Sequence, residues 1–265
     1  MRVYISVDIE GCAGVTAWDE TEYGQPGYDY AAEQMTKEVA AACRGAMAAG
    51  ADEIVVKDGH GSALNIIPSG LPRGVKLLRG WCQDIDSMMA GVGAGFDCAF
   101  YIGYHAEAGN SGNPLSHTTE FSVFQKATLN GEPMAEFDMN LLAASRHGVP
   151  SALITGDKAI CEKALKTCPW IKTAAVKEGV SGGTLSMHPD DACDLIEEAA
   201  RAAVSEKAYE QYEIPERFEM ELTYKEHTKA KFASTYPGAV LTDSCTVRFE
   251  TDDPAELLKA YSFMM

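Results

Sequence analysis

The chain has 265 residues, of which 46% are hydrophobic, and its 39 acidic and 22 basic residues give a formal net charge of −17. A chain of this size can fold as one large domain, or as a large and a small one, without disulfides. The negative charge argues against nucleic acid or an anionic membrane surface as a partner. No segment resembles a signal peptide or a membrane span, and the eight cysteines form no CxxC pair, so we expect a cytoplasmic protein with reduced thiols.

The first 160 residues alternate between strand-like and helix-like patterns. We expect strands over residues 2–7, 53–57 and 97–104, and helices over residues 31–48 and 84–92. Gly50 is a plausible C-cap of the first helix, and Asp84 a plausible N-cap of the second. This alternation predicts an α/β fold, in which helices flank a parallel, Rossmann-like sheet with right-handed crossovers.

The pattern changes after the third strand. Residues 121–135 predict a β-hairpin that turns at Asn130-Gly131. The next expected elements are a helix over residues 136–146, a fourth parallel strand over residues 149–157 and a helix over residues 189–207. From about residue 215, strands and helices alternate in short pieces. We therefore predict a large α/β domain over residues 1–205 and a small α+β domain over residues 206–265. No obvious flexible linker marks the boundary between them.

Ligand-type side chains follow each of the three predicted parallel strands. Asp8 and Glu10 follow the first strand, Asp58 and His60 the second, and His105 the third. Because open parallel sheets bind ligands at the carboxyl ends of their strands, we expect these side chains at one edge. Asp8 and Glu10 share a face of the extended chain and repel each other unless something positive lies against them. Histidine and carboxylate groups bind zinc and related metals, so the pattern predicts a metal site.

Three further polar residues can reach the same edge. His117, in a loop rich in Gly, Asn and Pro, is a candidate ligand, general base or nucleophile. Glu136 opens a predicted helix, where it is either a ligand or an acid favoured by the helix dipole. Asn140, one turn later, can face the same pocket, and Asp58 is interpreted as a partner that orients a ligand histidine. We interpret three residues as packing rather than substrate contacts: Trp18, Trp81 and Trp170.

Five stretches, in this order and at these intervals, resemble the D-aminopeptidase (DppA) family of zinc-dependent peptidases, family M55. They are SVDIEG, KDGH, GYHA, SHT and AEFDMN. The resemblance covers nearly the whole chain and extends to TAAVKEGVS and PGAVLTDSCTVRF. It implies a cytoplasmic aminopeptidase that hydrolyses short peptides with a free amino terminus, including D-amino-acid peptides. It also implies two Zn²⁺ ions per subunit and assembly into a ring-shaped homodecamer.

The resemblance also implies roles for particular residues in the large domain. The metal ligands that it implies are Asp8, Glu10, His60, His105 and Glu136, with Asp8 as the bridging carboxylate. His117 matches the catalytic residue, as either nucleophile or base. Ala135 departs from the family pattern, which has glycine before the glutamate. Two dications would supply the positive charge that lets Asp8 and Glu10 lie together.

Other classes of function compete with this interpretation. Gly11 and Gly14 follow the first strand as a phosphate loop would, but the fingerprint is incomplete and Asp8 and Glu10 would repel a pyrophosphate. A metal-dependent amidase or deacylase of other small substrates would use the same kind of site. A peptide-binding protein without turnover is the third alternative, and the presence of His117 and all five candidate ligands argues against it.

Overall fold

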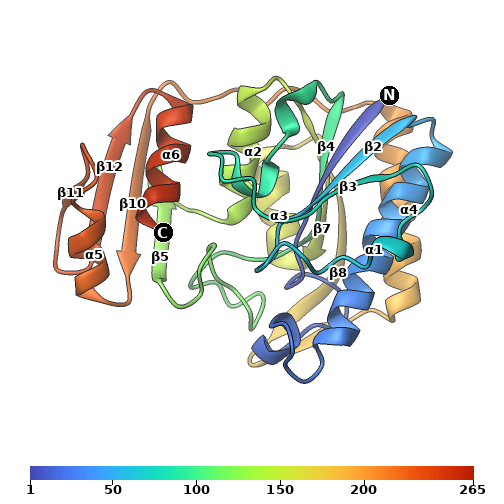
Figure 1. Ribbon diagram of the computed structural model, residues 1–265, viewed down its shortest axis with the longest axis horizontal. Coiled ribbons are helices and arrows are strands. Elements are labelled where there is room, and N and C mark those ends of the chain that lie inside the picture. Colours follow the sequence, from blue (N-terminus) through green and yellow to red (C-terminus); the bar gives the residue numbers. More distant parts are fainter.

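The computed structural model describes residues 1–265 and contains two β-sheets, each with helices packed on it (Figure 1). The larger sheet has the strand order β3-β2-β1-β4-β7-β8-β9. Its strands are β1 (Arg2–Val7), β2 (Glu53–Asp58), β3 (Lys76–Leu78), β4 (Cys98–Tyr104), β7 (Ser151–Asp157), β8 (Lys172–Val180) and β9 (Gly183–Ser186). All neighbours pair in parallel except β8 and β9, so the predicted α/β fold with a Rossmann-like sheet is confirmed, with one antiparallel edge strand.

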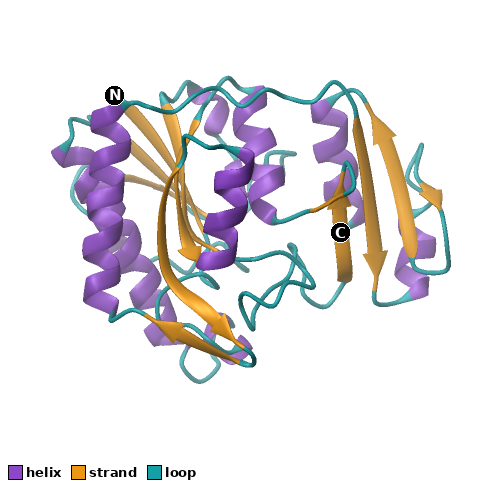
Figure 2. Ribbon diagram, turned by 180° about the vertical axis from the view of Figure 1, so that it is seen from behind, coloured by secondary structure: helices purple, strands orange, loops and turns teal.

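Helices cover both faces of this sheet, as the two opposite views show (Figures 1 and 2). Helices α1 (Tyr28–Ala48) and α4 (Pro189–Glu206) pack on one face, and α2 (Glu136–Arg146) and α3 (Lys158–Thr167) on the other. Strands such as β1 and β4 are apolar on both faces because both faces are covered. None of the helices combines the length and the hydropathy that crossing a bilayer would require.

One predicted helix, over residues 84–92, is wrong. The chain forms only two short 3₁₀ turns there, η3 (Ser87–Met89) and η4 (Val92–Ala94). Ser87 has φ 48° and Gly91 φ 88°, so the backbone leaves the right-handed helical region twice within the predicted helix. Four further elements were not predicted: β3, α3, β8 and β9. Strands β3 and β9 are too short to carry a periodic signal, whereas α3 has an amphipathic pattern and the Asp157 N-cap that could have been recognised.

The smaller sheet is antiparallel, with the order β11-β12-β10-β5-β6. Its strands and helices are β5 (Phe124–Leu129), β6 (Glu132–Pro133), β10 (Phe218–Tyr224), α5 (His227–Ala233), β11 (Val240–Leu241), β12 (Thr246–Thr251) and α6 (Pro254–Met264). The predicted hairpin is present: Asn130 and Gly131 have φ values of 52° and 83°, as a type I′ turn requires. Strand β5 pairs with β10, so this sheet takes strands from both sides of residue 205, and the domain boundary stays a prediction.

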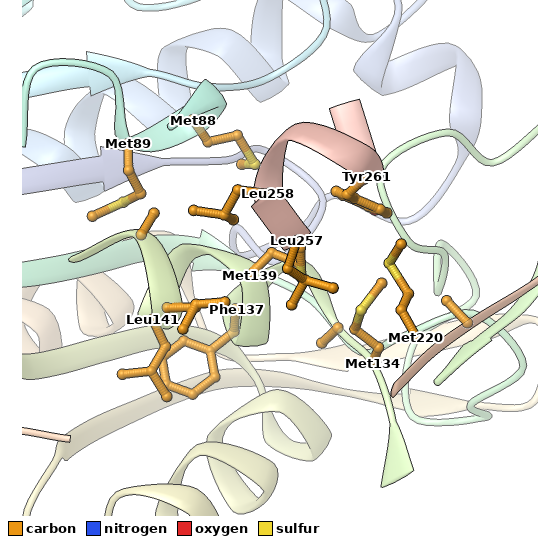
Figure 3. Packing of buried hydrophobic residues seen from close by; sticks show 14 of the residues in the cluster. Met88, Met89, Met134, Phe137, Met139, Leu141, Met220, Leu257, Leu258 and Tyr261 are labelled. Atoms are coloured by element: carbon orange, nitrogen blue, oxygen red, sulfur yellow. The ribbon is translucent and has the colours of Figure 1, made fainter. Parts of the chain in front are cut away.

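The two sheets are joined by a common apolar core. A cluster of 39 buried residues extends from the α2 face of the large sheet into the small sheet and α6. Figure 3 shows Leu257 and Leu258 of α6 beside Met139 of α2, with Met88 of η3 close by. Burying a side chain of this size contributes about 2 kcal/mol, so several such contacts hold α6 firmly against α2. The end of α6 is thereby placed near the carboxyl ends of the large sheet's strands.

Backbone contacts hold the ends of β1, β2 and β4 side by side. The Gly59 amide donates to Val7 O (3.0 Å), and the Gly11 amide donates to Gly103 O (2.8 Å). Gly103 has φ 75°, and a Cβ atom there would lie 2.3 Å from the carbonyl oxygen of Asp8. Only glycine permits both this conformation and this close approach. The strand ends that carry the ligand-type residues are therefore fixed by backbone packing.

We expect Gly103→Ala to lower the free energy of unfolding by about 3 kcal/mol or more, because left-handed strain and a backbone clash act together. The matched control is Gly131→Ala, where φ is 83° but nothing lies within 4 Å of the added Cβ. That variant should lose only about 1 kcal/mol. Urea denaturation monitored by circular dichroism measures both values. Equal losses in the two variants would show that the close approach at Gly103 carries no energetic cost.

Candidate metal centre

Six of the predicted site residues converge at the carboxyl edge of the large sheet. They come from the ends of three adjacent strands, one loop and the first turn of α2: Asp8, Glu10, His60, His105, His117 and Glu136. The strand order reverses at β1, which lies between β2 and β4, and ligands bind at such a switch point in open α/β sheets. The six residues form two groups of three, and the potential ligand atoms within each group lie within 4.8 Å of one another.

Asp8 belongs to the first group and also faces the second. Its Oδ1 atom is 3.2 Å from Nδ1 of His60, and its Oδ2 atom is 3.3 Å from Nε2 of His105. Glu10 completes the first group, because its Oε2 atom lies 3.1 Å from Nδ1 of His60. A carboxylate that presents one oxygen to each group has the arrangement of a bridging ligand.

The second group is formed by His105, His117 and Glu136. The Oε1 atom of Glu136 lies 3.3 Å from Nε2 of His105 and 3.5 Å from Nε2 of His117. The two imidazole rings stack with centroids 4.2 Å apart and an angle of 7° between their planes. Both rings therefore present the same nitrogen to one carboxylate oxygen.

Backbone carbonyl groups fix the orientation of all three imidazoles. The ring nitrogens that face away from the carboxylates donate as follows: His60 Nε2 to Thr21 O (2.8 Å), His105 Nδ1 to Ala106 O (2.9 Å) and His117 Nδ1 to Leu115 O (2.9 Å). In a neutral imidazole, the other nitrogen then carries a lone pair. Each lone pair points at a carboxylate, which is repulsive unless a proton or a cation lies between them.

The environment of these groups requires positive charge. Asp8, Glu10 and His105 are each only 2% exposed, and their Oδ2, Oε2 and Nε2 atoms have no hydrogen-bond partner. Burial by itself raises the pKa of Asp8, but the facing imidazoles of His105 and His60 outweigh it and hold that pKa well below its usual value. Burial, unpartnered oxygens and imidazole lone pairs together fit divalent cations that prefer nitrogen and oxygen ligands.

The two histidines respond in the opposite direction. Burial lowers the pKa of each ring, yet the facing carboxylates raise it well above the ordinary value of 6.5. Glu10 and Asp8 act on His60, and Glu136 and Asp8 act on His105. Without a cation, both rings therefore retain protons at pH values where a free imidazole is neutral.

Glu136 is positioned by the start of helix α2. Its Oε1 atom accepts a hydrogen bond from the Thr119 amide (2.7 Å), and its neighbour Ala135 is the N-cap of the helix. Ala135 has φ −90°, a conformation open to any residue, and its amide donates to Asp138 Oδ2 (2.6 Å). The departure from glycine at this position therefore introduces no strain beside Glu136.

Asp58 and Asn140 do not contact the candidate ligands with their side chains. Both Asp58 oxygens accept hydrogen bonds from Asn65 and Ile66, and the Asn65 amide group also donates to His60 O (2.7 Å). Asp58 therefore shapes the loop that carries His60 and does not touch the ring. Asn140 donates to Tyr104 Oη (2.9 Å) behind the site and does not line the cavity, so a substrate contact is not supported.

Two side chains that were not predicted as part of the site, Lys177 and Asn113, hold the backbone of Glu10. Lys177 of β8 is 4% exposed, and its ammonium group donates to the carbonyl oxygens of Glu10 and Val15. The Asn113 side chain donates to the same Glu10 oxygen (3.0 Å). Burial lowers the pKa of Lys177, although nearby groups such as Cys12 oppose the change. The sequence did carry a signal for Lys177: a lysine follows the apolar residues Ala174, Ala175 and Val176 in the stretch TAAVKEGVS, where a buried strand could enclose it.

A cavity of about 620 Å³ opens beside the two groups. Asp8, Glu10, His60, His117 and Glu136 line it, together with Trp18, Trp81 and Phe121. The packing interpretation holds for Trp170 and Trp18, which pack against the two apolar core clusters, although Trp18 also lines the cavity. Trp81 belongs to neither cluster; it is 39% exposed and lines the cavity. The site is a cavity with polar donors at its base and aromatic rings on its walls, as is usual for small-molecule sites.

The fold and the site together define an α/β protein with a candidate two-metal centre. The family model described as D-aminopeptidase, peptidase family M55, matches residues 1–263. The chain therefore belongs to this family of peptidases, as its motifs predicted, and it is a hydrolase of the aminopeptidase type.

Individual relatives agree over the full length. The D-aminopeptidase of Bacillus subtilis (strain 168) is 28% identical over 268 residues, which cover 100% of this chain and 96% of that protein. A solved structure is described as the Zn-dependent D-aminopeptidase DppA from Bacillus subtilis, a self-compartmentalizing protease. It matches with a TM-score of 0.92 and 27% identity, over 100% of this chain and 96% of that one.

We expect a divalent cation to release protons when it binds the metal-free protein. His60 and His105 have raised pKa values, so both rings carry protons at neutral pH and lose them only as the pH rises through those values. These protons must leave before the rings can act as metal ligands. Titration calorimetry with Zn²⁺ as the probe, in two buffers of different ionisation enthalpy, should give about one or more protons released at pH 7. Affinity should rise with pH. Heats that do not depend on the buffer would contradict this prediction.

Proposed function

We propose that the protein is a two-zinc aminopeptidase that hydrolyses short peptides with a free amino terminus, with D-amino-acid peptides among its substrates. The observation that carries the proposal is the position of Asp8, which presents one oxygen to each of two buried donor groups. The description of the related structure as a zinc-dependent D-aminopeptidase supports the choice of zinc and of D-peptides.

The donor groups suggest how two zinc ions would be held. Asp8, Glu10 and His60 would bind one ion, and Asp8, His105 and Glu136 the other. Bound zinc would supply the Lewis-acid chemistry that polarises a scissile carbonyl group. The carbonyl groups that fix the histidine rings, and Lys177 behind Glu10, would keep the ligands in place before any ion binds.

His117 is the residue with the geometry for proton transfer or attack. Its Nδ1–H group donates to Leu115 O, which leaves Nε2 as the nitrogen with a lone pair, and the side chain lines the cavity. That nitrogen can accept a proton from an attacking water and return it to the leaving amine. It can also attack the carbonyl carbon itself, and both roles need the same neutral tautomer.

We extend the proposal to a homo-oligomer, which is a decamer according to the family resemblance. The description of the related structure as a self-compartmentalizing protease supports an assembly in which access to the sites is restricted. A cytoplasmic location stays a prediction.

Removal of metal should abolish activity. We expect dialysis against a chelator to lower the rate of D-Ala-D-Ala hydrolysis by at least about 100-fold, and Zn²⁺ to restore it with saturation at two ions per chain. His60→Ala should bind about one ion fewer and lose activity. The control is His227→Ala, since His227 is an exposed residue at the start of α5. Full activity in protein shown by elemental analysis to be metal-free would end the proposal.

The choice of substrates separates the proposal from its alternatives. An aminopeptidase should hydrolyse D-Ala-D-Ala and reject the N-acetylated peptide, and comparison with L-Ala-L-Ala measures stereochemical preference. Cleavage of acetylated substrates or simple amides in preference to free-amine peptides would favour an amidase or deacylase. Calorimetric binding of peptides without product would favour a binding protein.

Replacement of His117 should separate catalysis from metal binding. We expect His117→Ala to keep both metal ions and to lower kcat by about 10²- to 10⁴-fold, because proton transfer at Nε2 is lost. His117→Asn, which keeps a polar group beside Trp18 and His105, should behave in the same way. The loss of one metal ion in both variants would instead identify His117 as a ligand, which its place in the second donor group also allows.

A further inference from the structure

The cavity beside the candidate metal centre has an exposed apolar surface. Four large side chains there remain accessible: Trp81 (39%), Phe121 (37%), Phe263 (67%) and Met265 (41%). They come from three separate parts of the chain, namely the segment before η3, the loop before β5 and the end of α6. Exposed apolar groups that gather in one cavity mark a binding surface.

Trp18 and Phe121 form a continuous wall next to the proposed catalytic group. Their rings stack with centroids 4.4 Å apart and an angle of 25° between the planes. Trp18 also makes an edge-to-face contact with His117, with centroids 5.2 Å apart and an interplanar angle of 72°. Because this Trp18–Phe121 wall begins at the imidazole, a side chain next to the reacting bond is within reach of it.

Hydrogen bonds hold the turn that carries Trp18. Trp18 belongs to η1 (Trp18–Thr21), and the Thr21 carbonyl at the end of that turn holds the His60 ring. The Glu20 carboxylate accepts hydrogen bonds from the amides of Thr16 (2.7 Å) and Ala17 (2.9 Å), which closes the start of the turn. A ring carried by a turn that is held in this way loses little backbone entropy when a ligand binds to it.

A second aromatic residue stands beside His60. The Trp81 indole donates to Gly61 O (2.8 Å), and the buried Lys57 ammonium lies 4.8 Å from its ring centroid. The remaining charged side chains that line the cavity, apart from the candidate ligands, are carboxylates: Glu22, Asp84 and Glu120. Aromatic rings attract apolar and aromatic groups, while these carboxylates repel acidic ones.

We propose that the Trp18–Phe121 wall is a subsite for a large uncharged side chain that flanks the scissile bond, with aromatic side chains preferred and acidic ones rejected. This inference rests on the proposed aminopeptidase function and names its substrate class. The cavity, at about 620 Å³, has the volume of sites that enclose drug-sized ligands and exceeds what two alanine residues need.

The test compares two series of free-amine dipeptides with the zinc-loaded enzyme, D-Xaa-D-Ala and D-Ala-D-Xaa, where Xaa is Ala, Leu, Phe, Lys or Glu. In at least one series we expect kcat/KM for Phe to exceed that for Ala by about tenfold or more, with Glu the poorest substrate. Trp18→Ala should reduce the ratio of kcat/KM for the Phe peptide to kcat/KM for the Ala peptide to about threefold or less. Phe121→Ala, which removes the outer ring of the wall, should reduce it too and serves if Trp18→Ala does not fold.

The control variant is Phe232→Ala on α5, because Phe232 is 76% exposed and does not line the cavity. It should keep the wild-type ratio. An equal or better rate for Ala in both series would overturn the inference, as would a ratio that neither wall variant changes. A rate for Lys tenfold above that for Phe would overturn it in favour of charge recognition.

Failure of the proposed function is distinguishable from failure of this inference. If the zinc-loaded protein hydrolyses none of the peptides, the proposed function is wrong. Calorimetric binding of the same peptides then decides whether the Trp18–Phe121 wall is a subsite. Binding of a Phe peptide about tenfold tighter than D-Ala-D-Ala, lost in Phe121→Ala, would support the subsite. Equal affinities would overturn it.

Discussion

The Asp8 carboxylate, buried between two histidines, is the interaction on which the rest of the structure depends. Three acidic side chains of the site, Asp8, Glu10 and Glu136, are nearly inaccessible to water, and burying such charges together is costly unless positive charge lies among them. The imidazoles of His60 and His105 face Asp8 from either side and present ring nitrogens to it. Protons or cations at these positions therefore turn a cluster of repelling groups into a stable centre.

The architecture of the large sheet makes this cluster possible. Strand β1 lies between β2 and β4, so the carboxyl ends of these three strands are neighbours. Residues that are about fifty positions apart in the chain therefore lie side by side. Gly103 allows the backbones to approach closely, and Lys177 and Asn113 hold the carbonyl group of Glu10 from below. The ligand groups are thus held by rigid strands and by backbone hydrogen bonds, which is the usual way to preorganise a metal site.

The small sheet contributes to the same cavity from the other side. The hairpin β5–β6 leaves the large sheet after the His117 loop and pairs with β10, and α6 returns to pack on α2. This path brings Phe121 and the end of α6 to the cavity, next to the η1 turn that carries Trp18. The apolar walls therefore depend on the joining of the two sheets, whereas the polar donors come from the large sheet, its loops and the first turn of α2, which packs on it.

Local sequence determined much of this protein. The alternation of apolar strands and amphipathic helices predicted the α/β fold, and Asn130-Gly131 predicted the hairpin because few other pairs adopt its turn. The positions of Asp8, Glu10, His60 and His105 after strands predicted that they would lie together, since parallel strands end at one edge. The tertiary structure alone decided what depends on distant contacts: the two 3₁₀ turns after Asp84, the buried position of Lys177, and the places of Trp18 and Trp81 in the cavity lining. A tryptophan has the same local pattern whether it packs in a core or lines a site, and only the neighbours that folding brings to it make the difference.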